Sequence, residues 1–464
     1  MYDAKRKCRV GKAESTLTQQ FSFWKKPFKK ISKIEVLNGL SRMKLEEYID
    51  QVKSCVRKFD DPRQGNNKSY SMEEIGMSAY SVFHLQSPSF LSHQKNMKRK
   101  KGSHNGKTLF GFSNIPSDNH IRQVLDSVPP ETMNPFFDYA LGAMNLEEWL
   151  VDGRLLVALD GVTFFSSSTI SCSCCLRKEL SNGTRYSHAA LCPVIVHPHQ
   201  KQVLPLAPLF IKNEDGQSKQ DCEINAAKRW VLANKEFLTR HKVILLGDDL
   251  FSRAPFINLI QSFPDVDYVF VAKPSSHPYL YQWIEDLDSK DKISHVVKEK
   301  AFASHDHHYI MANAVPLNGG EEVPTVSFLD MAVFNKKGKQ LYHNTFVTSL
   351  TLTSQNIHQI ACMGRNRWRI ENEAFNVLKT KGYNLSHNFG HGEKNLANLL
   401  AVFNIVAFTV HTLWQITNET FQKIFNAFSS RKQFFQALLT LTIFHLFHSW
   451  EHLFEFVKDG LEEI

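Results

Sequence analysis

The order of short apolar runs between residues 154 and 273 constrains the fold of this chain more than any other feature. Three strand-like runs rich in Val, Leu, Ile and Phe come first, followed by a helix, a strand, a second helix and a last strand. The runs occupy residues 154–165, 184–198, 202–211, 219–238, 242–249, 253–263 and 267–273. Short connections favour an antiparallel meander for the first three strands, whereas crossover helices make the later strands parallel. The sequence therefore predicts an α/β fold with a mixed sheet flanked by helices.

The chain changes texture on both sides of this region. Residues 1–148 are polar and helical in pattern, and residues 149–271 carry the α/β order. Residues 272–362 return to strands, punctuated by NGG and KKGK turns, and residues 363–464 are mainly helical. We predict a basic helical amino-terminal domain for DNA binding, a core interrupted by a β-rich insertion, and carboxy-terminal helices that complete the core.

Basic residues are concentrated in two segments. The chain has 55 Lys and Arg against 46 Asp and Glu, a net charge of +9, which favours a polyanionic partner. Residues 1–34 carry much of the surplus, and the run at 95–107 has no acid. These segments are either solvated surface or phosphate-contacting arms. The candidates for DNA contact in the second run are Lys98, Arg99, Lys100 and Lys101.

The start of the chain and its cysteines favour a cytoplasmic protein. The start is charged and lacks an apolar segment with a small-residue cleavage site, and the eight cysteines show no framework spacing. Two apolar stretches, 399–413 and 434–450, are interrupted by Asn and His and fall short of the ~20 residues of a membrane span. We expect both to be buried helices, with no membrane partner.

Acidic side chains stand at unusual places in the apolar pattern. Asp160 shares a face with the apolar residues of the run 154–165, if that run is one strand, and Asp248 and Asp249 end the apolar run that follows the first helix. Glu371 falls on one helix face with Trp368, Phe375 and Leu378, pointing towards a core. A buried ion pair with Arg367 one turn earlier explains Glu371, and so does metal binding.

Three such acids together are typical of a divalent-metal site. Mg²⁺ takes hard oxygen ligands, and two ions about 4 Å apart clamp the attacking and leaving oxygens of a phosphoryl displacement. Asp160, Asp248 and Glu371 supply three carboxylates for such a site.

Several motifs resemble the DDE transposases of bacterial insertion sequences, which carry an RNase H-like catalytic core with a β-rich insertion before the last acid. The similar stretches cover roughly residues 60–415. They are GMSAYSVFHLQSPSFL, IPSDNHIRQVLDSVPP, ALDGVTFFSS, LLGDDLFS, GRNRWRIENEAF and GYNLSHNFGHGEKNLANLLAVFNIVAFTVH. The resemblance implies that Asp160, Asp248 and Glu371 hold two Mg²⁺ or Mn²⁺ ions, and that the enzyme cuts and rejoins DNA at the ends of its own element.

The signature around the glutamate is matched in part. The family pattern is Tyr, two residues, Arg, three residues, Glu, six residues, Lys. Arg367 and Glu371 fit it, but Gly364 replaces the tyrosine and Leu378 the lysine, with Lys379 adjacent. Asp248 is preferred to Asp249 because an aromatic residue, Phe251, follows three positions later, as in the family.

The resemblance also implies partners. Double-stranded DNA, both the terminal repeats and the target, is the expected partner, bound by a homodimer in the cytoplasm. Residues expected to contact DNA near the glutamate are Arg365, Arg367, Lys379 and Lys381. Two alternatives remain open: a DNA-binding relic without catalysis, and an RNase H-like nuclease with other substrates.

Cysteine and histidine spacing offers a second possible metal site. Cys172 and Cys175 form a CxxC, and Cys192 with His197 complete a possible zinc set, although packed thiols also explain them. His387 and His391 lie in a glycine-containing loop that is also explained by a tight turn between helices.

Overall fold

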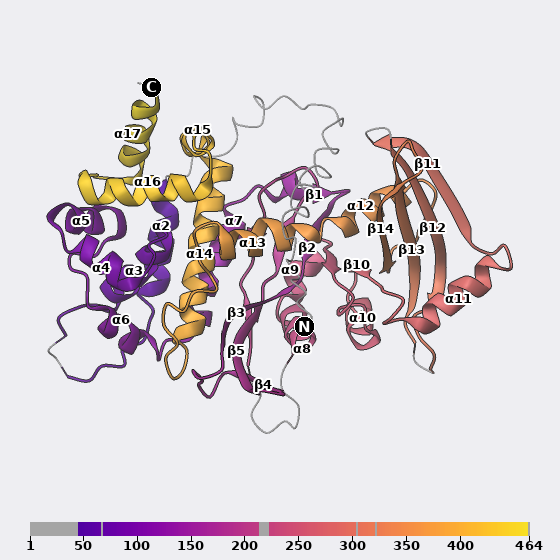
Figure 1. Ribbon diagram of the computed structural model, residues 1–464, viewed down its shortest axis with the longest axis horizontal. Helices are drawn as coiled ribbons and strands as arrows, with labels where there is room; N and C mark the ends of the chain where they lie inside the picture. Colours follow the sequence, from indigo (N-terminus) through magenta and orange to yellow (C-terminus); the bar gives the residue numbers. More distant parts are fainter. Residues whose placement is uncertain (1–44, 66–67, 213–221, 303–304, 321–322, 463–464) are drawn as a thin grey trace, which may run out of the picture. The chain divides into compact units, whose positions relative to one another are not determined.

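The computed structural model describes residues 45–65, 68–212, 222–302, 305–320 and 323–462 (Figure 1). The basic segment 1–34 lies outside the described residues. The described chain falls into two compact units. The larger unit holds residues from 45 to 270 and from 362 to 462, and the smaller unit holds residues from 271 to 361. Together they make a mixed α/β protein, as the sequence predicts.

A mixed sheet is the centre of the larger unit. Its strands run in the order β7, β6, β2, β9, β10, and β1 pairs with β2. Their bounds are Leu150–Val151 (β1), Arg154–Ala158 (β2), Val194–Val196 (β6), Leu204–Pro205 (β7), Ile244–Gly247 (β9) and Asp267–Val271 (β10). Strand β6 is antiparallel to β2 and to β7, whereas β9 is parallel to both β2 and β10. The predicted change from antiparallel to parallel pairing is therefore confirmed.

A second sheet continues from the first, because the chain bends between them. It contains β3 (Gly161–Ser167), β4 (Leu176–Leu180), β5 (Gly183–Leu191) and β8 (Leu209–Ile211). The prediction of one strand over 154–165 was wrong, since β2 and β3 belong to different sheets and Asp160 lies at the bend. The second and third predicted strands are divided in the same way. Apolar composition does not reveal these bends, because the strand halves on both sides carry buried apolar residues.

Helices connect the parallel strands. The predicted helix over 219–238 begins partly outside the described residues and is divided into α8 (Glu223–Ala233) and α9 (Lys235–Arg240). The break lies at Asn234, whose side-chain amide donates to the Trp230 carbonyl at 2.8 Å and competes with the helical pattern. Helix α10 (Ala254–Gln261) leads to β10 as predicted.

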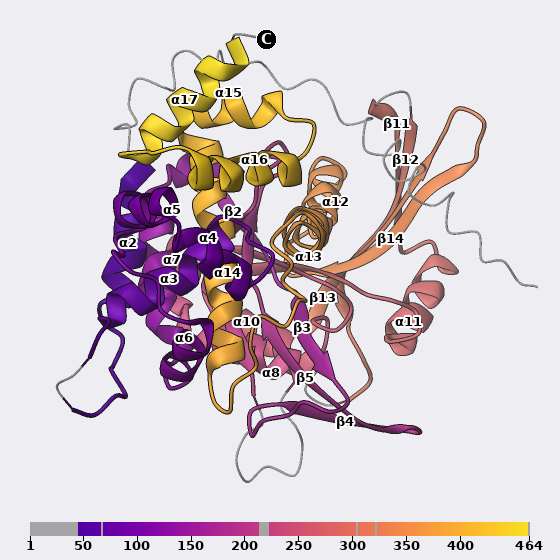
Figure 2. The same cartoon turned by 60° about the vertical axis from the view of Figure 1, so that its left-hand side comes forward.

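The amino-terminal helices share a core with the carboxy-terminal ones. They are α2 (Leu45–Val56), α3 (Met72–His84), α4 (Phe90–Met97), α5 (Lys100–Asn105), α6 (Asp118–Leu125) and α7 (Asn134–Gly142). Helices α2, α3, α6 and α7 pack against α14 (Leu396–Thr417) (Figure 2). The Trp414 indole donates to the Leu45 carbonyl at 3.1 Å. The basic run near residue 100 separates apolar patches in the sequence, but it forms α5 and a π-helical turn, Gly106–Phe110.

Both apolar stretches near the carboxyl terminus form helices within the protein. Helix α14 is long and apolar enough to span a membrane by length and composition, yet 94% of its most apolar window is buried inside the protein. This burial confirms the prediction of a core helix. The second stretch is divided, because α16 (Arg431–Phe444) ends before α17 (Trp450–Glu462) begins. Helix α15 (Glu419–Ala427) lies between α14 and α16 in the sequence.

The described part of the smaller unit is an antiparallel meander preceded by a helix. Its strands are β11 (Ser294–Phe302), β12 (His305–Pro316), β13 (Thr325–Phe334) and β14 (Gln340–Thr348), preceded by α11 (Pro278–Asp288). The last three strands cover the predicted ones, and α11 and β11 were not predicted. Tyr281 of α11 donates a hydrogen bond to the Ala272 carbonyl at 2.8 Å.

Asp126 organises the loop before α14. Its carboxylate accepts hydrogen bonds from the backbone N–H groups of Glu393 (2.9 Å), Lys394 (3.1 Å) and Leu396 (3.0 Å). These groups precede or begin α14 and lack helical partners of their own. A single side chain thus joins the end of α6 to the start of the core helix.

We expect Asp126→Ala to lower the free energy of unfolding by about 2–4 kcal/mol, because three backbone donors lose their acceptor. Calorimetric unfolding measures the loss. Asp118→Ala is the matched control, because its partner Arg122 lies 3.8 Å away at the surface and such pairs contribute below ~1 kcal/mol. Equal losses in the two variants would contradict this role for Asp126.

Candidate functional site

Asp160 and Asp248 lie at the same edge of the central sheet. Strands β2 and β9 are parallel, with Ala158 opposite Leu246, and each aspartate follows two residues later. The Leu159 N–H donates to the Leu246 carbonyl at 2.8 Å, which extends the pairing up to the aspartates. Neighbouring strands are spaced about 4.8 Å apart. The fold therefore brings these two acids side by side at the carboxyl ends of the strands, where α/β sheets usually meet ligands.

Arg367 links Asp160 to Glu371. Its Nη1 lies 2.6 Å from Oε1 of Glu371 and 3.5 Å from Oδ2 of Asp160. The ion pair of Arg367 with Glu371, expected from the helical spacing, is thus present. Arg367 also contacts the carboxylate of Asp160, from a distant part of the sequence. A guanidinium between two carboxylates orients both of them.

Glu371 does not point into the core, so the predicted orientation was wrong. Its side chain is 49% exposed, whereas Phe375 and Leu378 are buried. The chain turns at residues 366–367 after α12 (Ile357–Arg365) and then forms a π-helix, Ile370–Phe375, before α13 (Asn376–Thr380). A π-helix bonds each residue to the fifth one along, so the rotation of ~100° per residue does not hold there. The irregular turn leaves Glu371 accessible beside Arg367.

Arg369 fixes this irregular segment to the sheet. Its guanidinium donates to the carbonyls of Gln200 (2.6 Å) and Pro198 (2.8 Å) in the loop after β6, and its Nε donates to Asn366. No motif or spacing in the sequence distinguishes Arg369. It lies two residues before Glu371, and its three hydrogen bonds set the position of that segment.

The charges of this site affect one another strongly. Burial and the nearby Glu223 raise the pKa of Asp160 to about 7, and Asp248 and Glu371 contribute in the same direction, against a lowering by Arg367. Burial and Asp248 also raise the pKa of Glu223. Burial and the neighbouring carboxylates therefore both disfavour the ionised forms of Asp160 and Glu223.

Glu223 is an acid of this site that the sequence analysis missed. It begins α8, and its pKa is lowered in part by a hydrogen bond with the backbone of Gly161. A Cβ on residue 161 would lie 2.5 Å from the carboxyl carbon of Glu223, so only glycine allows this approach. Acids are common in the first turn of helices, because they complement the helix dipole, and no sequence pattern distinguishes this one from the others.

The two adjacent aspartates differ in their surroundings. The Asp248 carboxylate accepts the Leu250 N–H at 2.9 Å, and its charge acts on both Asp160 and Glu223. The backbone carbonyl of Asp249 accepts the Ser252 hydroxyl at 2.8 Å. The choice of Asp248 over Asp249 stays a prediction.

The predicted DNA-contacting residues are placed in two regions. Lys379 and Lys381 are exposed at the end of α13, Arg365 is half-buried, and Arg367 is engaged with the two acids. The positive charge of Lys379 lowers the pKa of Cys192, against stronger effects from burial, Asp160 and Glu223. The Lys379 charge therefore acts on the same buried thiol as the charges of Asp160 and Glu223. In the other region Lys98, Arg99 and Lys100 are exposed, and the Lys101 ammonium donates to the Phe444 carbonyl at 2.5 Å.

The structure brings together only two of the four residues of the possible zinc set. Cys172 and Cys175 lie together, but their neighbours are His188 and His391. Cys192 is buried beside the acids, and the His197 ring contacts Trp149 and His199 instead. Strand β5 brings His188 to the CxxC loop, and the loop after α13 brings His391, neither of which the linear spacing reveals.

The donor set at the sheet edge suits a hard divalent cation. Asp160, Asp248, Glu371 and Glu223 offer carboxylate oxygens, and Arg367 supplies one positive charge among them. Mg²⁺ and Mn²⁺ prefer such ligands, and a bound cation would offset the burial and the neighbouring charges that raise the pKa of Asp160. No protein-family model matches the chain, and no curated protein sequence is significantly similar to it.

We expect Asp160→Asn to stabilise the metal-free protein above about pH 7. The raised pKa means that the folded state holds this proton more tightly than the unfolded state, so stability falls as pH rises from about 4 towards 7. Asp160→Asn does not ionise and therefore avoids this loss of stability, which is on the order of 1–3 kcal/mol. Melting temperatures at about pH 5 and pH 8 test this, with the larger gain expected at the higher pH. A variant that melts lower than wild type at pH ~8 would contradict the repulsion.

Proposed function

We propose that this protein is a DDE transposase that cleaves and joins DNA at the ends of its own element. The observation that carries the proposal is that Asp160 and Asp248 follow the ends of two adjacent parallel strands, and that Arg367 joins Glu371 to Asp160. These are the acids that the sequence resemblance assigns to catalysis. They come from distant parts of the chain, so the ion pairs of Arg367 with Asp160 and Glu371, and the effect of the Asp248 charge on Asp160, support the proposal.

The fold supports an RNase H-like core. The central sheet is mixed and flanked by helices, with antiparallel strands on one side of β2 and parallel strands on the other. The four-stranded meander of the smaller unit falls between β10 and the helix of Glu371 in the sequence, where the family has its β-rich insertion. Similarity of fold alone does not establish a function, so the proposed activity rests on the acids.

The acids and two arginines have distinct roles in this proposal. Asp160, Asp248 and Glu371 would hold the divalent cations. When bound, Mg²⁺ or Mn²⁺ lowers the pKa of a water molecule and neutralises charge that develops on the phosphodiester. Arg367 keeps the carboxylates of Asp160 and Glu371 turned towards each other, at 3.5 and 2.6 Å from its Nη1. Arg369 holds the π-helical segment in place through its hydrogen bonds to the loop after β6.

DNA is the partner in this proposal. The exposed Lys379 and Lys381 follow the Glu371 segment, and such side chains neutralise phosphates without reading sequence. Lys98, Arg99 and Lys100 offer a second exposed basic group. A homodimer that brings two element ends together in the cytoplasm, near the nucleoid, belongs to the same proposal.

We expect cleavage of the element ends to need all three acids. The DNA that flanks the gene on both sides is placed on a plasmid, and purified protein is added with Mg²⁺ or Mn²⁺. Asp160→Ala, Asp248→Ala and Glu371→Ala should each reduce release of the flanked segment by at least about 100-fold, because each removes a metal ligand. Asp249 is the neighbour of Asp248, and Asp249→Ala is the matched control, which should retain cleavage.

Two other outcomes would replace the proposal. If the protein binds the ends but wild type never cuts them, it is a DNA-binding relic. If it cuts plasmid DNA without regard to the ends, it is a nuclease with the same core. Loss of cleavage in Asp249→Ala with retention in Asp248→Ala would reassign the second acid.

We expect the double variant Lys379→Glu, Lys381→Glu to bind DNA more weakly at every sequence. Reversing two charges should lower the affinity by at least about 10-fold and reduce the salt slope of log K by about 2, because two phosphate contacts are lost. Fluorescence anisotropy over a range of salt concentrations measures both quantities. Lys423→Glu changes an exposed lysine of α15 and is the control. An unchanged slope would exclude these lysines from the DNA path.

A further inference from the structure

A cluster of four sulfur and nitrogen ligands lies apart from the carboxylates. It consists of Cys172, Cys175, His188 and His391, all of them buried, with their ligand atoms within 4.8 Å of one another. The Sγ atoms of the two cysteines are 3.7 Å apart, well beyond the ~2.05 Å of a disulfide. The residues come from the loop before β4, from β5, and from the loop before α14. Packing of three separate segments thus converges on one point.

Five of the six distances among the four ligand atoms match the edges of a tetrahedron around zinc, and the sixth, from Cys172 Sγ to His391, is within 4.8 Å. With Zn–S near 2.3 Å and Zn–N near 2.0–2.1 Å, tetrahedral edges are about 3.8 Å for S to S, 3.6 Å for S to N and 3.3 Å for N to N. His188 Nε2 lies 3.5 and 3.4 Å from the two sulfurs, and His391 Nε2 lies 3.4 Å from Cys175 Sγ. The two Nε2 atoms are 3.2 Å apart. These edges agree with a common centre to within about 0.2 Å.

We propose that Cys172, Cys175, His188 and His391 bind one structural Zn²⁺ ion. Tetrahedral sites with two sulfur and two nitrogen ligands are typical of zinc. Four protein ligands fill such a site and leave no position for water or substrate, so the ion stabilises the fold and takes no part in chemistry. This inference does not depend on the proposed function.

The surroundings of His391 orient it for binding. Its Nδ1 lies 2.9 Å from the Gly392 carbonyl oxygen, which accepts a hydrogen bond only from a protonated nitrogen. Nε2 therefore keeps its lone pair and faces the sulfurs, the arrangement common to zinc-binding histidines. Gly392 has a φ of +69°, and a Cβ there would lie 2.2 Å from Asp126 Oδ1. The loop conformation thus requires this glycine and is held by the carboxylate of Asp126.

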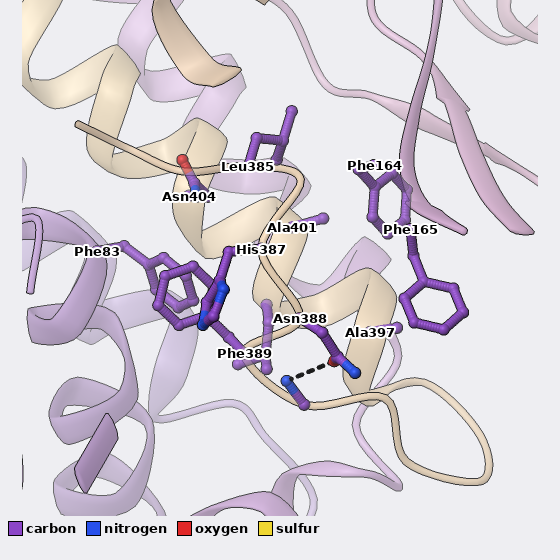
Figure 3. A pocket seen from close by; sticks show the side chains of 12 residues that line it. Phe83, Phe164, Phe165, Leu385, His387, Asn388, Phe389, Ala397, Ala401 and Asn404 are labelled. Carbon is purple, nitrogen blue, oxygen red and sulfur yellow. Dashed lines mark hydrogen bonds between the residues drawn. The ribbon is translucent and has the colours of Figure 1, made fainter. Parts of the chain in front are cut away.

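Aromatic side chains enclose the ligands on the same side. The Phe165 ring lies 4.5 Å from the His391 ring, and the Phe164 ring stacks on His188 at 6.0 Å. Phe164 and Phe165 also line a pocket, with the loop of His387, Asn388 and Phe389 on its other side (Figure 3). A low-dielectric shell of this kind excludes water and strengthens metal binding.

The ion would join the two segments that carry the functional acids. Strand β3 begins one residue after Asp160 and pairs with β5, which carries His188. The loop of His391 follows α13, the helix that continues the Glu371 segment. Zinc at this point would hold the second sheet and the loop together in the larger unit. Its binding free energy would then add to the stability of that unit.

The test measures metal in the full-length protein, purified without chelator from cells grown with zinc. Mass spectrometry of metals should find about one zinc per chain in wild type. Cys175→Ser and His391→Ala should reduce this below about a tenth. Cys174→Ser, in the same CxxC loop, and His387→Gln, in the same loop as His391, are the matched controls and should keep the zinc. Both control side chains lie outside the four-residue cluster.

A second measurement covers variants that fail to fold. Zinc is removed from wild type by a chelator and Co²⁺ is added, with absorption recorded. Tetrahedral Co²⁺ with two thiolates should give strong visible d–d bands and near-ultraviolet charge-transfer bands, and zinc should displace both. The absence of zinc in wild type together with no tetrahedral cobalt spectrum would overturn the proposal. Retention of zinc by Cys175→Ser and His391→Ala would overturn the ligand assignment.

Discussion

Repulsion among carboxylates at one edge of the central sheet is the constraint on which the rest of the larger unit depends. Asp160 is mostly buried and faces the charges of Glu223, Asp248 and Glu371, with Arg367 as the positive charge that lowers its pKa. A chain folding for stability alone would not collect these acids, because each buried charge without a full partner costs free energy. Sites that bind metals or substrates commonly carry such a cost. The proposed cation would offset this cost.

Three irregular features of the backbone bring these acids together. The bend after β2 turns Asp160 out of the strand, and Gly161 allows Glu223 to approach. The π-helical segment presents Glu371 at the surface while Ile370, Ala374 and Phe375 remain buried. Arg369 anchors that segment to the loop after β6. π-Helical turns often occur at functional sites, because they alter the direction of side chains locally.

The same irregularities explain what the sequence could predict and what it could not. The unit from β9 through α10 to β10 follows the expected periodicities, and so Asp248 was found at the end of its strand. Asp160 was singled out as an acid within one predicted strand. The bend at Asp160 lies between two apolar halves and leaves no trace in the hydrophobic pattern. The exposure of Glu371 was missed, since regular helix geometry was assumed across a π-helix. Glu223 looks like any acid at a helix start.

The cysteine and histidine cluster shows a different limit. A CxxC spacing identifies one pair of ligands, but the other pair comes from β5 and from a loop more than two hundred residues away in the chain, since His391 follows Cys175 by 216 positions. Nearness in sequence favoured Cys192 and His197, which the fold directs elsewhere. Only the pairing of β3 with β5 and the docking of the loop before α14 bring the four residues together.

The most direct test of the central claim locates the cation itself. Fe²⁺ is added in place of Mg²⁺ to the full-length protein, followed by ascorbate and peroxide, so that radicals cut the backbone close to the bound metal. The fragments are mapped by mass spectrometry. The account predicts cuts near residues 160, 223, 248 and 371 that excess Mg²⁺ suppresses and that are lost in Asp160→Asn. Cuts confined to other parts of the chain, or cuts that Mg²⁺ leaves unchanged, would contradict a metal site formed by these acids.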